Sequence, residues 1–189
     1  MGMKDRSLLA LALTLVLLAL LTTSSSSSSP AFSSPSAEFL ALHSFFTHTN
    51  GPTSWLSRCS ANWNFTCLEE GDGALCPDPC DPVKSFNGIT CFGPNVSSIF
   101  LPRCHMSGTL PEEALNELGW LAILELTENN ISGTLPAITK PIRLLQFQIG
   151  YNKLTGPIPA LHPSLLVAFF KSNYLTGKSI QCGVRLLTS

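Results

Sequence analysis

Charged residues are scarce in this chain of 189 residues, which has 12% charged side chains and a formal net charge of −1 at pH 7. Soluble domains carry about 25% charged residues. A nucleic-acid-binding protein needs clustered Lys and Arg to displace counterions from phosphate, and a protein held on an anionic membrane surface needs a polybasic segment. The scarcity of positive charge argues against both classes, and no nucleic-acid partner is expected.

The sequence also lacks the common short motifs of enzymes, namely H-E-x-x-H, G-x-S-x-G, G-x-x-x-x-G-K-[ST] and G-x-G-x-x-G. Its four histidines are scattered. Cys76 and Cys80 have His105 downstream, but this set does not match a closed structural zinc site. We therefore expect no enzymatic activity, no cofactor and no bound metal.

Long apolar runs are absent apart from one near the N-terminus. Lys4 and Arg6 precede an apolar run from Leu8 to Leu21 that only Thr14 interrupts. A helix over this run would span roughly 21 Å, short of the bilayer core of about 30 Å. The pattern predicts a secretory signal peptide over residues 1–23, and a retained membrane anchor is the alternative.

The segment after this run is dominated by serine and proline. Residues 24–36 include an unbroken serine run, which cannot bury apolar area to offset chain entropy. This segment is predicted to be a disordered spacer, and folded structure is expected to begin near Ser36.

A secreted chain makes the seven cysteines interpretable, because export favours disulfide bonds. Five cysteines cluster before the middle of the chain and are the disulfide candidates: Cys59, Cys67, Cys76, Cys80 and Cys91. Since seven is odd, at least one cysteine is unpaired or forms a disulfide with a second copy of the chain, giving a homodimer. Three N-x-[ST] sequons agree with export and predict N-glycosylation at Asn64, Asn95 and Asn130.

A repeat of about 23 residues organises the second half of the chain. Four copies fit the pattern L-x-x-L-x-L-x-x-N/C-x-L, and the first three continue as [ST]-G-x-[LI]-P. The L-x-L alternation puts two side chains on the buried face of a short strand. The N/C position suits a turn in which a side-chain amide satisfies backbone groups, and stacked copies would form a ladder. Its occupants are Cys104, Asn129, Asn152 and Asn173.

This repeat resembles that of plant-type, extracellular leucine-rich repeat proteins, and the preceding segment resembles the N-terminal cap of that family. A helical pattern from Ala37 to Phe46 opens the segment, and Phe86-Asn87-Gly88-Ile89-Thr90-Cys91 is similar to the W-x-G-V-x-C ending, with Phe86 at the Trp position. The resemblance implies an α/β solenoid: a short right-handed leucine-rich repeat array of about four coils with a parallel concave sheet and a helical, disulfide-bearing N-terminal cap.

The corresponding division is a cap over 37–95, repeats over 96–177, and a short C-terminal cap or tail over 178–189. Because the repeat motif tolerates cysteine at the ladder position, Cys104 is expected to be a buried free thiol. Coils spaced by about 4.8 Å put Cys182 roughly 15–20 Å from the cap, too far for a bridge. Two bridges and one loose thiol within the cap, or a bridge from the cap to Cys104, stay open.

Leucine-rich repeats bind partners on the concave sheet, so the resemblance implies a binding surface at the variable positions of the repeat. The candidates are Phe100, Arg103, Glu125, Glu128, Gln146, Gln148, Tyr151, Phe169 and Lys171. Arg103 and Glu128 hold equivalent positions in adjacent coils, and a surface ion pair is the expected role.

The resulting hypothesis is a secreted module at the cell wall or cell surface that recognises a protein, a peptide or a cell-wall glycan. It is similar in motif to short receptor ectodomains and polygalacturonase-inhibiting proteins. Membrane association is expected only through a retained N-terminal segment or a receptor partner. The alternative is a structural or surface-coat glycoprotein, or a truncated receptor-like ectodomain, without ligand-specific binding.

Overall fold

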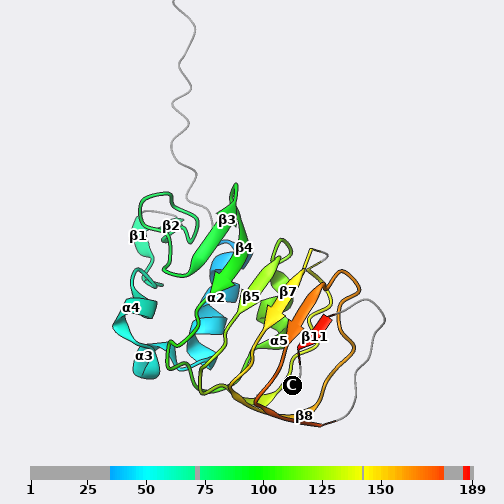
Figure 1. Ribbon diagram of the computed structural model, residues 1–189. Coiled ribbons are helices and arrows are strands. Elements are labelled where there is room, and N and C mark those ends of the chain that lie inside the picture. The colour runs from blue at the N-terminus through cyan, green and yellow to red at the C-terminus, as the bar shows by residue number, and fades with distance from the viewer. Residues whose placement is uncertain (1–34, 71–72, 142, 177–184, 188–189) are drawn as a thin grey trace, which may run out of the picture. The chain divides into compact units, whose positions relative to one another are not determined.

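The computed structural model describes residues 35–70, 73–141, 143–176 and 185–187 (Figure 1). The predicted signal peptide, residues 24–34 of the predicted spacer, and Cys182 lie outside these ranges. Of the helices described, none combines the length and the apolar character needed to cross a bilayer.

The folded part begins with helix α2, Ala37–His48, two residues longer than its sequence pattern indicated. The Ser36 hydroxyl accepts a hydrogen bond from the Phe39 amide at 3.1 Å and caps the first turn. After Asn50, which adopts a left-handed φ of 55°, the cap continues as two short helices and a hairpin. Their bounds are α3 Gly51–Ser54, α4 Ser57–Ser60, β1 Leu68–Glu70 and β2 Gly73–Leu75.

Aromatic side chains form the core of the cap. Trp55 and Trp63 are buried, and their rings meet at 4.9 Å. The indole N–H of Trp63 donates to the Asn87 carbonyl at 2.8 Å, so its polar atom is satisfied. Phe86, which replaces the family's Trp, is 1% exposed and packs 5.3 Å from Trp63. The Phe therefore serves the same packing role without needing a hydrogen-bond acceptor.

The repeats stack their strands into one six-stranded sheet in the order β11-β9-β7-β5-β4-β3 (Figure 1). Neighbouring strands are parallel except β3 and β4, which form an antiparallel hairpin joining the cap to the repeats. The strands are β3 Ile89–Phe92, β4 Asn95–Phe100, β5 Ile123–Glu125, β7 Gln146–Gln148, β9 Val167–Phe169 and β11 Arg185–Leu187. Part of the segment interpreted as a C-terminal cap or tail thus adds a strand to this sheet.

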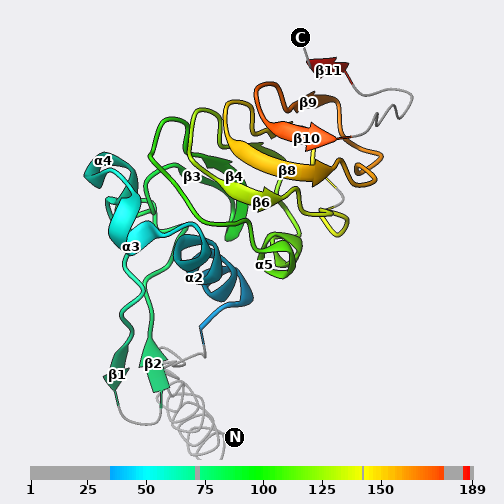
Figure 2. The ribbon, with the colours of Figure 1, turned by 90° about the horizontal axis from the view of Figure 1, so that it is seen from below.

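A second parallel sheet, which sequence analysis missed, lies along the other side of the coils (Figure 2). Its strands are β6 Ser132–Thr134, β8 Lys153–Pro157 and β10 Tyr174–Thr176. The [ST]-G motif, to which sequence analysis assigned no strand, contributes to β6 and β8. Gly133 has a φ of +83°, and a Cβ there would lie 3.0 Å from the Thr109 methyl of the previous coil. Glycine therefore permits both the turn and the close approach of successive coils.

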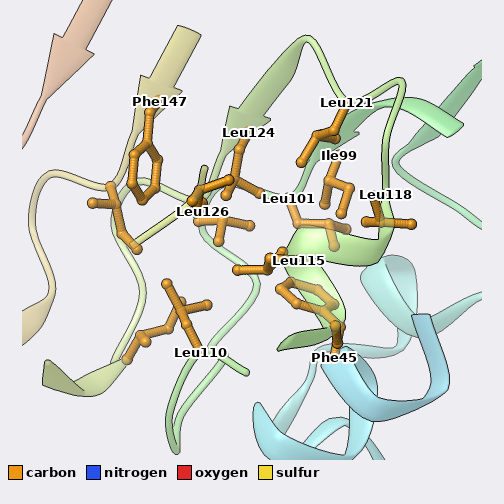
Figure 3. Packing of buried hydrophobic residues seen from close by; sticks show 14 of the residues in the cluster. Phe45, Ile99, Leu101, Leu110, Leu115, Leu118, Leu121, Leu124, Leu126 and Phe147 are labelled. Carbon is orange, nitrogen blue, oxygen red and sulfur yellow. The ribbon is translucent and has the colours of Figure 1, made fainter. Parts of the chain in front are cut away.

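The core runs between the two sheets as stacked rows of inward side chains (Figure 3). Ile99, Leu124 and Phe147 occupy equivalent positions in consecutive coils and are at most 2% exposed. Figure 3 shows Leu115, from helix α5 (Glu112–Glu117), and Phe45, from α2, next to these rows. Since no coil buries its apolar face alone, stability comes from contacts between neighbouring coils.

The asparagine ladder is a continuous network of hydrogen bonds, buried at Asn129 and Asn152 and half-buried at Asn173. Asn129 Oδ1 accepts from the amides of Cys104 and Met106 at 2.9 and 3.0 Å. Its Nδ2 donates to the carbonyls of Leu101 and Leu126 at 2.9 and 3.0 Å. Two later asparagines similarly connect neighbouring coils: Asn152 and Asn173. Each ladder amide satisfies backbone groups of its own coil and the coil before it.

Three disulfides are present: Cys59–Cys104, Cys67–Cys76 and Cys80–Cys91. The expectation that Cys104 is a buried free thiol was wrong, and the bridge from the cap to Cys104 is the arrangement found. The Leu56 amide donates to the Cys104 carbonyl at 3.0 Å, which holds α4 beside the first repeat. The two bridged Cα atoms lie 5.8 Å apart.

Glu38 connects the cap helix to the first repeat and predicts a pH dependence. Its carboxylate accepts from the Val96 amide at 2.9 Å. Partial burial raises the pKa of Glu38 above its ordinary value, opposed by the Val96 hydrogen bond and reinforced by Asp78. The folded state therefore binds the Glu38 proton more tightly than the unfolded state does. This contribution to stability is fully present below the unfolded pKa and is lost as pH rises through the folded pKa.

We expect Glu38→Gln to be at least as stable as the wild type at pH 7, because its amide oxygen still accepts from Val96 and carries no charge. The difference should shrink as pH falls through the raised pKa of Glu38, because protonated Glu38 resembles glutamine. Urea unfolding of both proteins across this pH range measures the difference. A Glu38→Gln variant that is less stable than the wild type by the same amount at every pH would contradict the raised pKa of Glu38.

Candidate binding surface

The outward side chains of β4, β5, β7 and β9, with the residues that follow each strand, form the surface that we call the sheet face. Strand register aligns them in rows across the coils. The row formed by the last residue of each strand, which we call the middle row, contains Phe100, Glu125, Gln148 and Phe169. Phe100, at the cap end of this row, is 57% exposed.

The row beyond the strand ends is set by a repeated left-handed residue. Arg103, Glu128, Tyr151 and Ser172 all have φ of 55–56° and directly precede the ladder positions. Arg103 donates from Nε and Nη2 to the two carboxylate oxygens of Glu128 at 2.8 and 2.6 Å. These contacts lower the pKa of Glu128 and raise that of Arg103. Both side chains are largely exposed, so this is a surface ion pair.

An aromatic pair occupies the C-terminal part of the sheet face. The rings of Tyr151 and Phe169 lie 6.0 Å apart, and Tyr151 is 46% exposed. Gly150 makes this arrangement feasible, because a Cβ there would lie 2.3 Å from the Phe169 ring. Lys171, half-buried, follows β9, and its backbone carbonyl accepts from the Tyr151 amide at 2.7 Å.

Glu125 differs from its neighbours because it occupies an outward position and yet is only 6% exposed. Its Oε1 accepts from both the amide and the hydroxyl of Thr127. Beside it, Gln148 Nε2 donates to Gln146 Oε1 at 3.2 Å. The repeat pattern placed Glu125 on this face but could not indicate its burial.

A second exposed aromatic group, which sequence analysis missed, lies beyond the sheet face. Phe92, at the end of β3, stacks on Trp120 with ring centroids 5.8 Å apart and planes at 16°. The Arg143 guanidinium carbon lies 4.4 Å from the Trp120 ring centroid. These residues fall outside the repeat template, so only their residue types could have drawn attention to them.

The three predicted glycosylation sites lie in different surroundings. Asn64 and Asn130 are exposed, whereas Asn95 is half-buried at the start of β4. Asn64 Oδ1 accepts from the Thr66 amide at 2.9 Å. Asn64 also borders a cap cavity of about 590 Å³, whose apolar lining includes Leu68 and Leu75.

The parts of the chain that the structure describes contain no cluster of three His, Cys, Asp or Glu side chains able to hold a metal ion. The sheet face instead offers aromatic, amide and charged groups spread over four strands. Such an arrangement provides contacts for a bound molecule.

No protein-family model matches the chain. It is 31% identical over 74 residues to pollen receptor-like kinase 2 of Arabidopsis thaliana, a match covering 38% of this chain and 11% of that protein. The chain thus spans about a tenth of the length of this curated relative.

Two solved structures share the fold. A pollen receptor kinase 3 structure is 30% identical, with a TM-score of 0.51 over 58% of this chain and 57% of the other. The structure titled PEPR1-AtPEP1 is 24% identical, with a TM-score of 0.55 over 74% of this chain and 22% of the other. The repeats, the solenoid and the disulfide-bearing N-terminal cap give this chain a leucine-rich repeat fold, and these likenesses make it similar to plant-type leucine-rich repeat receptor kinases.

Proposed function

We propose that this protein is a secreted binding module that recognises a peptide or protein through the sheet face. The observation that carries the proposal is the exposure of two large aromatic side chains there, 57% for Phe100 and 46% for Tyr151. Exposed aromatic groups of this kind are enriched among the residues that dominate binding energy. They lie on different coils, so an extended ligand could contact both.

The related folds support a peptide or protein ligand. The crystal structure of PEPR1-AtPEP1 pairs PEPR1 with AtPEP1, and this chain shares the PEPR1 fold. A cell-wall glycan, the third ligand class expected from sequence, has no comparable support. Because the chain covers only part of each relative, the partner of this protein is inferred from its own surface.

Export is part of the proposal. Three disulfides within a small cap and first repeat suit an oxidising compartment. Two of the three predicted glycosylation sites are exposed. A homodimer through Cys182 is a further proposal, which rests on the cysteine count alone.

A displayed library of random peptides, screened against the full chain produced in a secretory host, tests the binding function. We expect the enriched peptides to bind Phe100→Ala and Tyr151→Ala at least about tenfold more weakly than wild type. Phe92→Ala is the matched control, because Phe92 is an aromatic residue outside the sheet face and is more exposed than either of them, at 66%. Peptides that bind both sheet-face variants as tightly as wild type would refute the proposal.

A further inference from the structure

The middle row of the sheet face combines two aromatic rings with two polar groups. Phe100, Glu125, Gln148 and Phe169 are aligned in register on adjacent parallel strands. Strands lie about 4.8 Å apart, so the row spans roughly 15 Å. The aromatic residues occupy its two ends, and the carboxylate and the amide lie between them.

Glu125 has acceptor capacity that the protein leaves unused. Oε1 receives both Thr127 hydrogen bonds, whereas Oε2 receives none from the described residues. Within the described parts of the chain, no buried side-chain nitrogen or oxygen lacks a partner. Oε2 therefore keeps contact with solvent although the residue as a whole is 6% exposed.

The cations on the sheet face do not neutralise Glu125. Arg103 is held by Glu128, and the two salt bridges found in the described residues do not include Glu125. Lys171 lies beyond the end of β9. A largely buried carboxylate is costly unless a cation or several donors compensate it.

We propose that this row is a subsite for the cationic side chain of a lysine or arginine in the bound peptide. The ammonium or guanidinium donates to Glu125 Oε2, and the Gln148 carbonyl oxygen, which is not used in its bond to Gln146, provides a second acceptor. Phe100 and Phe169 contact the alkyl stem and the cation. An acidic side chain would instead meet the Glu125 charge. This subsite rests on the proposed function and names the chemistry of its ligand.

The test is a titration of the ¹⁵N-labelled protein with acetyl-Gly-Lys-Gly-amide, followed by NMR. Acetyl-Gly-norleucine-Gly-amide is the matched probe, since it keeps the stem and lacks the charge. We expect saturable shifts of the Thr127 amide, which donates to Glu125, with a Kd of the order of 1 mM for the lysine probe. The norleucine probe should leave that amide unshifted.

Glu125→Gln keeps an acceptor for Thr127 and removes the charge, so we expect it to weaken lysine-probe binding at least about tenfold. Glu117→Gln is the matched control, because that carboxylate pairs with Lys140 on α5, outside the sheet face, and it should bind the probe as wild type does. Equal responses to both probes, or wild-type binding by Glu125→Gln, would overturn the subsite.

The two proposals fail separately. Library peptides that depend on Phe100 and Tyr151 but bind Glu125→Gln as tightly as wild type would leave the binding function standing and overturn the subsite. Lysine-specific shifts at Thr127, without any library peptide that depends on those aromatic residues, would support the subsite chemistry and refute the binding function.

Discussion

Replacing both Cys59 and Cys104 by alanine should lower the free energy of unfolding by about 4 kcal/mol, the chain-entropy estimate for a bridge that spans 45 residues. Both cysteines are at most 4% exposed, so the substitution also removes buried packing. This bridge joins α4 of the cap to the first ladder position. Its loss therefore loosens the surface that covers the first coil.

The Cys67→Ala/Cys76→Ala variant is the matched control, since it removes a bridge of only 9 residues. The same estimate gives about 2.5 kcal/mol for that shorter loop. Urea unfolding without reductant, monitored by far-UV circular dichroism, measures both variants. The role assigned to the cap-to-repeat bridge would be contradicted if removing Cys59–Cys104 lowered the free energy of unfolding no more than removing Cys67–Cys76.

The sequence predicted those features whose side chains recur at the repeat period. A leucine or asparagine that returns once per coil has the same neighbours each time, so its role follows from the pattern. The Cys59–Cys104 bridge could not be predicted in this way. It depends on the path of the cap, where the Leu56 amide and the Arg58 guanidinium bind carbonyls of the first repeat.

The same reasoning explains what sequence analysis missed in the candidate site. The repeat pattern placed Glu125 outward, but its burial depends on which residues occupy the neighbouring strands. Asn116, on α5 and outside the sheet face, is a second residue whose role the repeat pattern did not indicate. It is buried, donates to the Glu112 and Ala137 carbonyls, and accepts from two backbone amides of the next coil. Because this asparagine does not recur once per coil, the pattern gave it no role.

The ladder predicts the second large effect, from Asn129→Ala. The substitution leaves the amides of Cys104 and Met106 and the carbonyl of Leu101 without their side-chain partner. The Leu126 carbonyl loses one donor and keeps its bond from Asn152 Nδ2. Each buried group left unpaired costs about 1–3 kcal/mol, and water entering the space recovers part of that cost. We expect a net loss of about 3–5 kcal/mol in the free energy of unfolding.

Two variants make this prediction specific to the interior of the ladder. Asn130→Ala, next in the chain and exposed, should change stability by less than about 0.5 kcal/mol in a host that adds no N-glycans. Asn173→Ala removes an equivalent side chain that is only half-buried, so water can replace part of its bonds. The order of loss should be Asn129, then Asn173, then Asn130, as measured by urea unfolding. Equal losses at Asn129 and Asn173 would show that the burial of a ladder amide does not set its contribution to the free energy of unfolding. They would also show that each ladder asparagine stabilises its own coil separately.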